Sequence, residues 1–112
     1  MILYHTSDKT IRHPDLAFSR AYLDFGKGFY TTPIRRQAEK YGRRFFKEGR
    51  EAYLNVYELD DELSGYTDIS RTEAIKRLRK KKPNWQICLC NQNLIDLHLH
   101  FVESIALSND ES

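Results

Sequence analysis

Apolar side chains recur along the chain in short runs and stripes, separated by polar and glycine-rich stretches. Residues 2–5 are rich in β-forming side chains and end at a polar Thr-Ser-Asp sequence, which predicts a short opening strand. Two glycines precede an aromatic and β-branched segment that predicts a second strand over residues 29–32. Further strands are predicted over residues 52–59, 85–90 and 99–107.

The hydrophobic pattern changes to a helical period after Thr32. This residue can cap a helix that begins at Pro33, a position where the missing N–H costs nothing. An apolar stripe with spacings of four, three and four residues follows, formed by Ile34, Ala38, Tyr41 and Phe45. Gly49 ends the predicted helix, which spans about four turns.

A second helix is predicted over residues 71–82, because Ser70-Arg71-Thr72-Glu73 has the form of a capping box and Pro83 stops the helix. Residues 92–97 predict a short third helix, and residues 15–23 contain a helical-looking fragment. The order of elements does not repeat the strand–helix–strand rhythm of a doubly wound sheet. We therefore predict an α+β domain with a largely antiparallel sheet.

The chain has 112 residues and a mass of 13.3 kDa, which allows one compact domain. We expect that domain over residues 1–107, followed by a polar, acidic tail over residues 108–112. With 40% hydrophobic and 30% charged residues, the composition argues against wholesale disorder. No apolar run approaches the roughly 18 residues of a membrane helix, and no basic and apolar leader opens the chain. We expect neither a membrane span nor a secretory signal.

The two cysteines, Cys88 and Cys90, are one residue apart. They are therefore poorly placed to bridge each other, and they lack partners for a zinc site. This usage predicts a reducing, cytoplasmic location. His98 and His100 are expected to share one face of a strand, where a metal would need further ligands that the neighbouring residues do not offer. No metal site is expected.

The net charge of +2 conceals two basic segments. Residues 33–50 hold seven Lys and Arg against two Glu, and residues 71–82 hold seven against one Glu. Because both segments are predicted helices, they suggest a surface for an anionic partner, either a nucleic acid or an acidic protein. The alternative is a pair of ordinary solvated helix faces.

Three features could carry chemistry. His5 ends the first predicted strand, where strands and loops commonly build sites. Gly26 and Gly28 would let the backbone approach a ligand closely, and Tyr30 follows them in a strand. Gln86 is a polar residue in an otherwise apolar strand and shares a face with both cysteines. Each feature also has a structural alternative: a hydrogen-bonded strand histidine, a glycine turn and a polar edge residue.

Four stretches of the sequence together resemble a known pattern. They are Tyr4-His5-Thr6-Ser7, Asp24-Phe25-Gly26-Lys27-Gly28-Phe29-Tyr30-Thr31-Thr32, Gln37-Ala38 and Trp85-Gln86-Ile87-Cys88. From residue 2 to about residue 103, the chain is similar to an uncharacterised bacterial family of small toxin-like proteins. That family is assigned to the ADP-ribosyltransferase superfamily, which includes a branch related to diphtheria toxin and the poly-ADP-ribose polymerases. The long second stretch is the specific motif.

The resemblance implies an ADP-ribosyltransferase-like split β-sheet and the use of NAD as a substrate. By that resemblance, His5 would bond a ribose hydroxyl of NAD, and Tyr30 would stack on the nicotinamide ring. Gln86 would occupy the third position, next to the nicotinamide ribose, where the branch usually has a glutamate. The backbone near Gly28 would hold the carboxamide, and Thr31 would assist at ribose or phosphate. The residues expected around NAD are His5, Thr6, Gly28, Phe29, Tyr30 and Thr31.

The same resemblance implies mono-ADP-ribosylation, by the toxin of a toxin–antitoxin pair, of a protein or nucleic-acid acceptor. A small helical antitoxin would be its partner. Cleavage of the nicotinamide–ribose bond develops an oxocarbenium-like charge, which a carboxylate stabilises better than the amide dipole of Gln86 does. The chain is also shorter in the middle than the family pattern, since Tyr66-Thr67 runs directly into Asp68-Ile69-Ser70. Two alternatives therefore stay open: an NAD glycohydrolase, and a catalytically inactive basic module that binds nucleic acid or an acidic partner.

Overall fold

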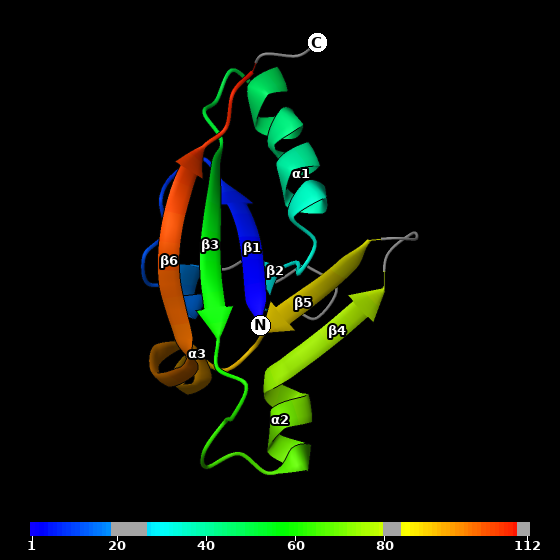
Figure 1. The fold of residues 1–112 in the computed structure, drawn as a ribbon, viewed down its shortest axis with the longest axis vertical. Coiled ribbons are helices and arrows are strands. Elements are labelled where there is room, and N and C mark those ends of the chain that lie inside the picture. The colour runs from blue at the N-terminus through cyan, green and yellow to red at the C-terminus, as the bar shows by residue number, and fades with distance from the viewer. Residues whose placement is uncertain (19–26, 80–83, 110–112) are drawn as a thin grey trace.

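The computed structural model describes residues 1–18, 27–79 and 84–109 (Figure 1). Its strands are β1 (Ile2–Ser7), β2 (Phe29–Thr31), β3 (Tyr53–Leu59), β4 (Ile75–Arg79), β5 (Trp85–Leu89) and β6 (Leu99–Ala106). Within these ranges the helices are α1 (Arg35–Lys47), α2 (Asp68–Ala74) and α3 (Gln92–His98), with a 3-10 turn, η1, at Leu16–Phe18. The predicted α+β class with antiparallel strands is confirmed.

The strands form two small antiparallel sheets, ordered β1-β3-β6 and β2-β5-β4. The sheets meet where Tyr4 of β1 faces Thr32, just after β2, in an isolated bridge. The Tyr4 amide donates to the Thr32 carbonyl at 2.8 Å, and the Thr32 amide donates to the Tyr4 carbonyl at 2.9 Å. Figure 1 shows the first sheet upright and β4 and β5 running obliquely beside it. The junction between the sheets therefore lies at β1 and β2.

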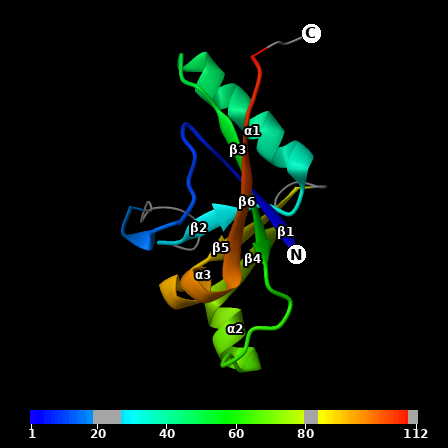
Figure 2. The ribbon, with the colours of Figure 1, turned by 60° about the vertical axis from the view of Figure 1, so that its left-hand side comes forward.

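Two apolar clusters hold these elements together. The larger one takes side chains from both sheets and from α2 and α3, among them Leu3, Phe29, Tyr57, Leu89 and Leu94. On the other face of the first sheet, Ala38 of α1 packs against Leu54 and Val56 of β3. Figure 2 shows α1 alongside this sheet. Side chains alternate between faces along β3, so this strand serves both clusters. None of the helices in the described ranges is long and apolar enough to cross a membrane.

The first helix begins at Arg35 rather than at Pro33. The Thr32 carbonyl already accepts from the Tyr4 amide, whereas the carbonyl of an N-cap residue accepts the first hydrogen bond of its helix. Ile34 is the N-cap, and the Thr32 hydroxyl accepts a hydrogen bond from the Ile34 amide at 3.1 Å. The predicted cap residue thus supports the start of the helix from two positions before the N-cap.

The prediction of a helix over residues 71–82 is wrong. α2 ends at Ala74, and from Ile75 onward the chain pairs residue by residue with β5 as the strand β4. Long-range pairing outweighs the helical tendency of this lysine- and arginine-rich stretch. The capping box is formed by Thr67 and Ser70, three residues earlier than predicted. The second basic segment is therefore divided between α2 and β4, and its residues 80–82 lie outside the described ranges.

The other predicted strands and the short third helix agree with the structure to within two residues. Of the helical-looking fragment at 15–23, the structure describes the 3-10 turn η1 and leaves residues 19–23 outside the described ranges. Asp24-Phe25-Gly26 of the specific motif and residues 110–112 of the expected tail also lie outside them.

Candidate functional site

His5 lies in β1 and is half-buried against β2. Its Nδ1 atom is 2.6 Å from the backbone carbonyl oxygen of Tyr30. Because a carbonyl oxygen only accepts, Nδ1 carries a proton and donates it, which leaves a lone pair on Nε2 of the neutral ring. The ring of Phe29 packs against the imidazole with 4.4 Å between centroids. Residues of β2 therefore fix both the position and the tautomer of His5.

The two sheets diverge next to this imidazole. Tyr4 and Thr32 exchange two backbone hydrogen bonds, as neighbouring antiparallel strands do. Continued pairing would bring Tyr30 opposite Thr6, but the Tyr30 carbonyl accepts from the side chain of His5 instead. The imidazole therefore occupies the place where the ladder between the sheets stops.

Tyr30 and Gln86 project from one face of the second sheet. Tyr30 lies opposite Cys88 of β5, and residues that are opposite each other, or two apart on one strand, share a face. The Oε1 atom of Gln86 is buried and has no hydrogen-bond partner within the described ranges. Leaving such a buried acceptor unpaired costs about 1–3 kcal/mol, so a ligand that donates to it would recover that cost. His5 is connected to this pair through the Tyr30 backbone.

Three residues expected around a cofactor already have partners within the fold. The Thr6 hydroxyl donates to a backbone carbonyl of α1 at 2.5 Å, and the Thr31 hydroxyl donates to a carbonyl of β5 at 2.9 Å. Phe29 belongs to the larger apolar cluster. Because side chains alternate along β2, Phe29 and Thr31 face away from Tyr30. The structure therefore does not bring their side chains together with those of Tyr30 and Gln86.

Gly28 approaches β5 so closely that a side chain has no room. A Cβ built on Gly28 would lie 2.2 Å from the Cys88 sulfur. Its backbone does not explain the choice of glycine, because the glycines with positive φ in the described ranges are Gly49 and Gly65. The absence of a Cβ lets the segment that leads into Tyr30 lie directly on β5.

Gln37 is a positioning residue whose role the sequence did not reveal. Its Oε1 atom accepts from the Thr32 hydroxyl at 2.9 Å and from the Trp85 backbone amide at 2.9 Å. One side chain of α1 therefore joins the chain just after Tyr30 to the chain just before Gln86. Gln37 belongs to one of the four stretches of the family pattern. The sequence does not show, however, which groups a polar side chain on a helix binds.

Burial lowers the pKa of His5 below its ordinary value of 6.5 and outweighs the hydrogen bond to Tyr30, which acts in the opposite direction. The unfolded chain then binds a proton more readily than the folded protein does, so stability falls as the pH drops below about 6.5 and levels off below the folded-state pKa. When the pH is lowered from about 7.5 to about 5.5, we expect the free energy of unfolding to fall less in His5→Gln than in the wild type. The measurement is unfolding in urea at each pH. An identical pH dependence in both proteins would contradict this role of His5.

Asp60 brings the two histidines near the chain end together. His98 is the last residue of α3 and His100 lies in β6. The prediction that the two histidines share one face of a strand is therefore wrong. Their rings contact the two oxygens of Asp60, at 3.1 Å from His98 Nδ1 and 2.9 Å from His100 Nε2. The hydrogen bond from His98 is the main cause that holds the pKa of Asp60 below its usual range. Within the described ranges, no cluster of three or more His, Cys, Asp or Glu side chains could hold a metal ion.

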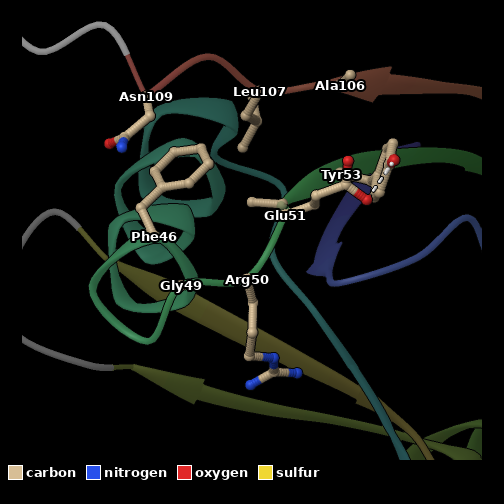
Figure 3. A pocket seen from close by; sticks show the side chains of 9 residues that line it. Phe46, Gly49, Arg50, Glu51, Tyr53, Ala106, Leu107 and Asn109 are labelled. Atoms are coloured by element: carbon tan, nitrogen blue, oxygen red, sulfur yellow. Dashed lines mark hydrogen bonds between the residues drawn. The ribbon is translucent and has the colours of Figure 1, made fainter.

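Two cavities lie on the surface of the fold, and Asp60 borders one of them. One of about 540 Å³ adjoins α2 and β4. The other, of about 370 Å³, is lined by Phe46, Arg50 and Leu107 among others (Figure 3). Arg50 is already paired with Asp8 at 2.8 Å and with Glu48 at 2.7 Å. Neither cavity includes a residue singled out from the sequence as a site residue.

The basic outer face that was predicted for the first helix is present on α1. Its exposed basic residues are Arg35, Arg36, Lys40, Arg43, Arg44 and Lys47. Arg35 pairs with Glu39 at 3.1 Å, and the Arg44 guanidinium lies over the Tyr41 ring at 5.2 Å from its centroid. Exposed pairs of this kind are weak, so the face stays positively charged toward solvent.

Comparison with known families gives a match over more than half of the chain. A family model described as "Protein of unknown function (DUF3990)" matches residues 1–71. The matched range contains His5 and Tyr30 and ends before Gln86. No curated protein and no solved structure matches the chain.

Proposed function

We propose that this chain, which belongs to that family of proteins of unknown function (DUF3990), is an NAD-dependent mono-ADP-ribosyltransferase. We infer that its two sheets form the split sheet of an ADP-ribosyltransferase-like domain, and that it acts as the toxin of a toxin–antitoxin pair. The observation that carries the proposal is the hydrogen bond from His5 to the Tyr30 carbonyl. It joins a histidine and a tyrosine of the specific sequence pattern at the junction of the sheets.

His5 is proposed to bind a ribose hydroxyl of NAD. With Nδ1 donating to the Tyr30 carbonyl, Nε2 is the acceptor that such a hydroxyl requires. The lowered pKa of His5 supports this role, because a neutral ring at pH 7 keeps the Nε2 lone pair.

Tyr30 and Gln86 are proposed to contact the nicotinamide half of the molecule. The Tyr30 ring would stack on the flat nicotinamide. The unpaired Oε1 of Gln86 supports a contact with a hydroxyl of the neighbouring ribose, since that hydroxyl can donate to it. Their common face on the second sheet supports binding of one ligand by both side chains.

In the proposed reaction, the bond between the ribose carbon and the nicotinamide nitrogen breaks, and its electron pair leaves with nicotinamide. The ribose becomes oxocarbenium-like, and a nucleophile of the acceptor attacks its carbon and loses a proton to solvent. Gln86 would orient the sugar and stabilise the charge through its amide dipole. NAD is consumed as a substrate, and the scheme gives no role to a metal.

The exposed basic residues of α1 favour an acceptor or partner with negative charge. A nucleic acid or an acidic protein would satisfy this condition, and so would a small helical antitoxin with an acidic face. The same basic face favours a second candidate function, that of a catalytically inactive module that binds nucleic acid or an acidic partner. A phosphate-driven binder loses affinity steeply between low and moderate salt, which separates the two candidates.

The test incubates the protein with NAD that is labelled in its adenosine half, with and without cell extract. The proposal predicts release of nicotinamide and transfer of the label to a macromolecule. Label recovered only as free ADP-ribose would identify a glycohydrolase, in which water replaces the acceptor. Intact NAD after incubation with folded protein and extract would contradict both enzymatic functions. His5→Ala serves as the control and is expected to abolish the release.

Exchange of Gln86 for glutamate is expected to raise the rate of nicotinamide release about tenfold, because a carboxylate stabilises the developing positive charge better than an amide does. Gln86→Leu keeps a similar size without the dipole and is expected to lower the rate. The measurement is initial-rate nicotinamide release at saturating NAD. An unchanged or lower rate in Gln86→Glu would exclude a position for residue 86 beside the reacting ribose.

A further inference from the structure

The two cysteines lie closer together than their spacing led us to expect. The sulfur atoms of Cys88 and Cys90 are 3.1 Å apart, and both are free thiols. Residues two apart in a strand have Cα atoms about 6.4–6.8 Å apart, at the upper end of the range that a disulfide spans. Cys90 follows the last residue of β5, so the bond would join the residue just after the strand to Cys88 within its paired part.

This dithiol touches the segment that carries Tyr30. The Cα of Gly28 lies over both sulfurs, since a Cβ built there would be 2.2 Å from Cys88 Sγ and 3.4 Å from Cys90 Sγ. Tyr30 pairs with Cys88 across the two strands, and its side chain is hydrogen-bonded to the Cys88 thiol. A change at the sulfurs therefore acts directly on the chain between Gly28 and Tyr30.

The two thiols differ in accessibility. Cys88 is fully buried, whereas Cys90 is half-buried. Burial also raises the pKa of the Cys88 thiol, while Lys76 of β4, directly across from it, acts in the opposite direction. An oxidant from solvent would therefore reach Cys90 first, and Cys88 would be the second thiol to react.

We propose that Cys88 and Cys90 form an oxidation site, at which a hydroperoxide produces a reversible intramolecular disulfide that loosens β2 from β5. In the first step the Cys90 thiolate attacks a peroxide oxygen, the O–O bond breaks, and Cys90 becomes a sulfenic acid. Cys88 sulfur then attacks the Cys90 sulfur and loses its proton, and hydroxide leaves to become water. The two thiols lose two electrons in total, and hydrogen peroxide is reduced to two molecules of water.

The loosening follows from the geometry. The sulfurs must approach from 3.1 Å to the length of a disulfide, about 2.05 Å, which draws Cys90 toward Cys88. Because Gly28 lies against both sulfurs, this movement shifts the contact by which the segment before Tyr30 lies on β5. It also removes the thiol to which the Tyr30 side chain is bonded. This inference concerns the chemistry of the thiols and does not depend on the use of NAD.

The first measurement is the mass of the intact protein after treatment with hydrogen peroxide, together with non-reducing electrophoresis. Because the chain has two cysteines, an intramolecular disulfide gives a monomer that has lost two hydrogens and regains them with dithiothreitol. Cys90→Ser is the matched control and cannot form this bond. A disulfide-linked dimer, or a monomer oxidised at Cys90 to a sulfinic acid, would overturn the proposal.

The second measurement is hydrogen exchange of the Phe29–Thr31 amides in the reduced and oxidised protein. We expect these amides to exchange roughly tenfold faster once the disulfide has formed. The same treatment of Cys90→Ser is expected to leave their exchange unchanged. A disulfide that forms without any change in exchange would overturn the claimed effect on β2.

Discussion

Replacing Tyr30 with alanine is expected to lower the rate of the proposed nicotinamide release from NAD by roughly 10- to 100-fold. Stacking of a flat heterocycle on an aromatic side chain contributes about 1–3 kcal/mol, which corresponds to a loss of this size. The substitution removes the ring but keeps the backbone carbonyl that holds the His5 imidazole. The measurement is nicotinamide release at subsaturating NAD, where both binding and turnover contribute.

Tyr30→Phe is the matched control for this prediction. It keeps the stacking ring and removes the hydroxyl, with its hydrogen bond to Cys88. We expect its rate to stay within a few-fold of wild type. Unfolding of both variants in urea separates loss of the site from loss of the fold. Wild-type activity in a folded Tyr30→Ala variant would contradict the stacking role.

Replacing Gly28 with alanine is expected to destabilise the protein by about 3 kcal/mol, the upper end of the usual cost of overpacking. The new Cβ would lie 2.2 Å from Cys88 Sγ, and also 3.3 Å from the Leu89 carbonyl oxygen. The sulfur belongs to a fully buried side chain and cannot move away freely. The segment of Gly28 must then lift from β5 and take Tyr30 with it. The measurement is the free energy of unfolding in urea.

A second substitution and a control isolate the cause. In a Cys88→Ala background the sulfur is absent, and we expect Gly28→Ala to cost less than about 1 kcal/mol. Gly42→Ala is the control. A Cβ on Gly42 would lie 2.8 Å from the flexible end of the Leu107 side chain, and its next nearest contact would be at 3.4 Å. Alanine also favours the helix at that position. Equal destabilisation by Gly28→Ala with and without the Cys88 sulfur would contradict the close contact.

The apolar pattern of the sequence predicts a helix or strand correctly where the spacing of its own apolar residues produces its buried face. The stripe from Ile34 to Phe45 predicts α1, and Ala38 of that stripe does pack on the first sheet. The basic stretch from Ile75 to Arg79 reads equally well as a helix, since its apolar residues suit either structure. Pairing with β5 decides its conformation, and this contact is not encoded in local spacing.

The candidate site divides in the same way. The sequence pattern singles out His5, Tyr30 and Gln86, and two of them contact each other in the structure. That contact could not be predicted, because it depends on where β1 and β2 diverge. The short distance between the cysteine sulfurs could not be predicted from the sequence either, because it depends on the side-chain rotamers at the end of β5. Likewise, the two hydrogen bonds that Gln37 accepts form only because α1, the residue after β2 and the start of β5 lie next to one another.

Calorimetric titration of NAD into the purified protein tests most directly whether His5, Tyr30 and Gln86 together hold a dinucleotide. The proposed arrangement predicts saturable binding of one NAD per chain, competition by free nicotinamide, and a large loss of affinity in folded His5→Ala and Tyr30→Ala variants. Absence of NAD binding to the folded wild-type protein, or equal binding by all three proteins, would contradict it.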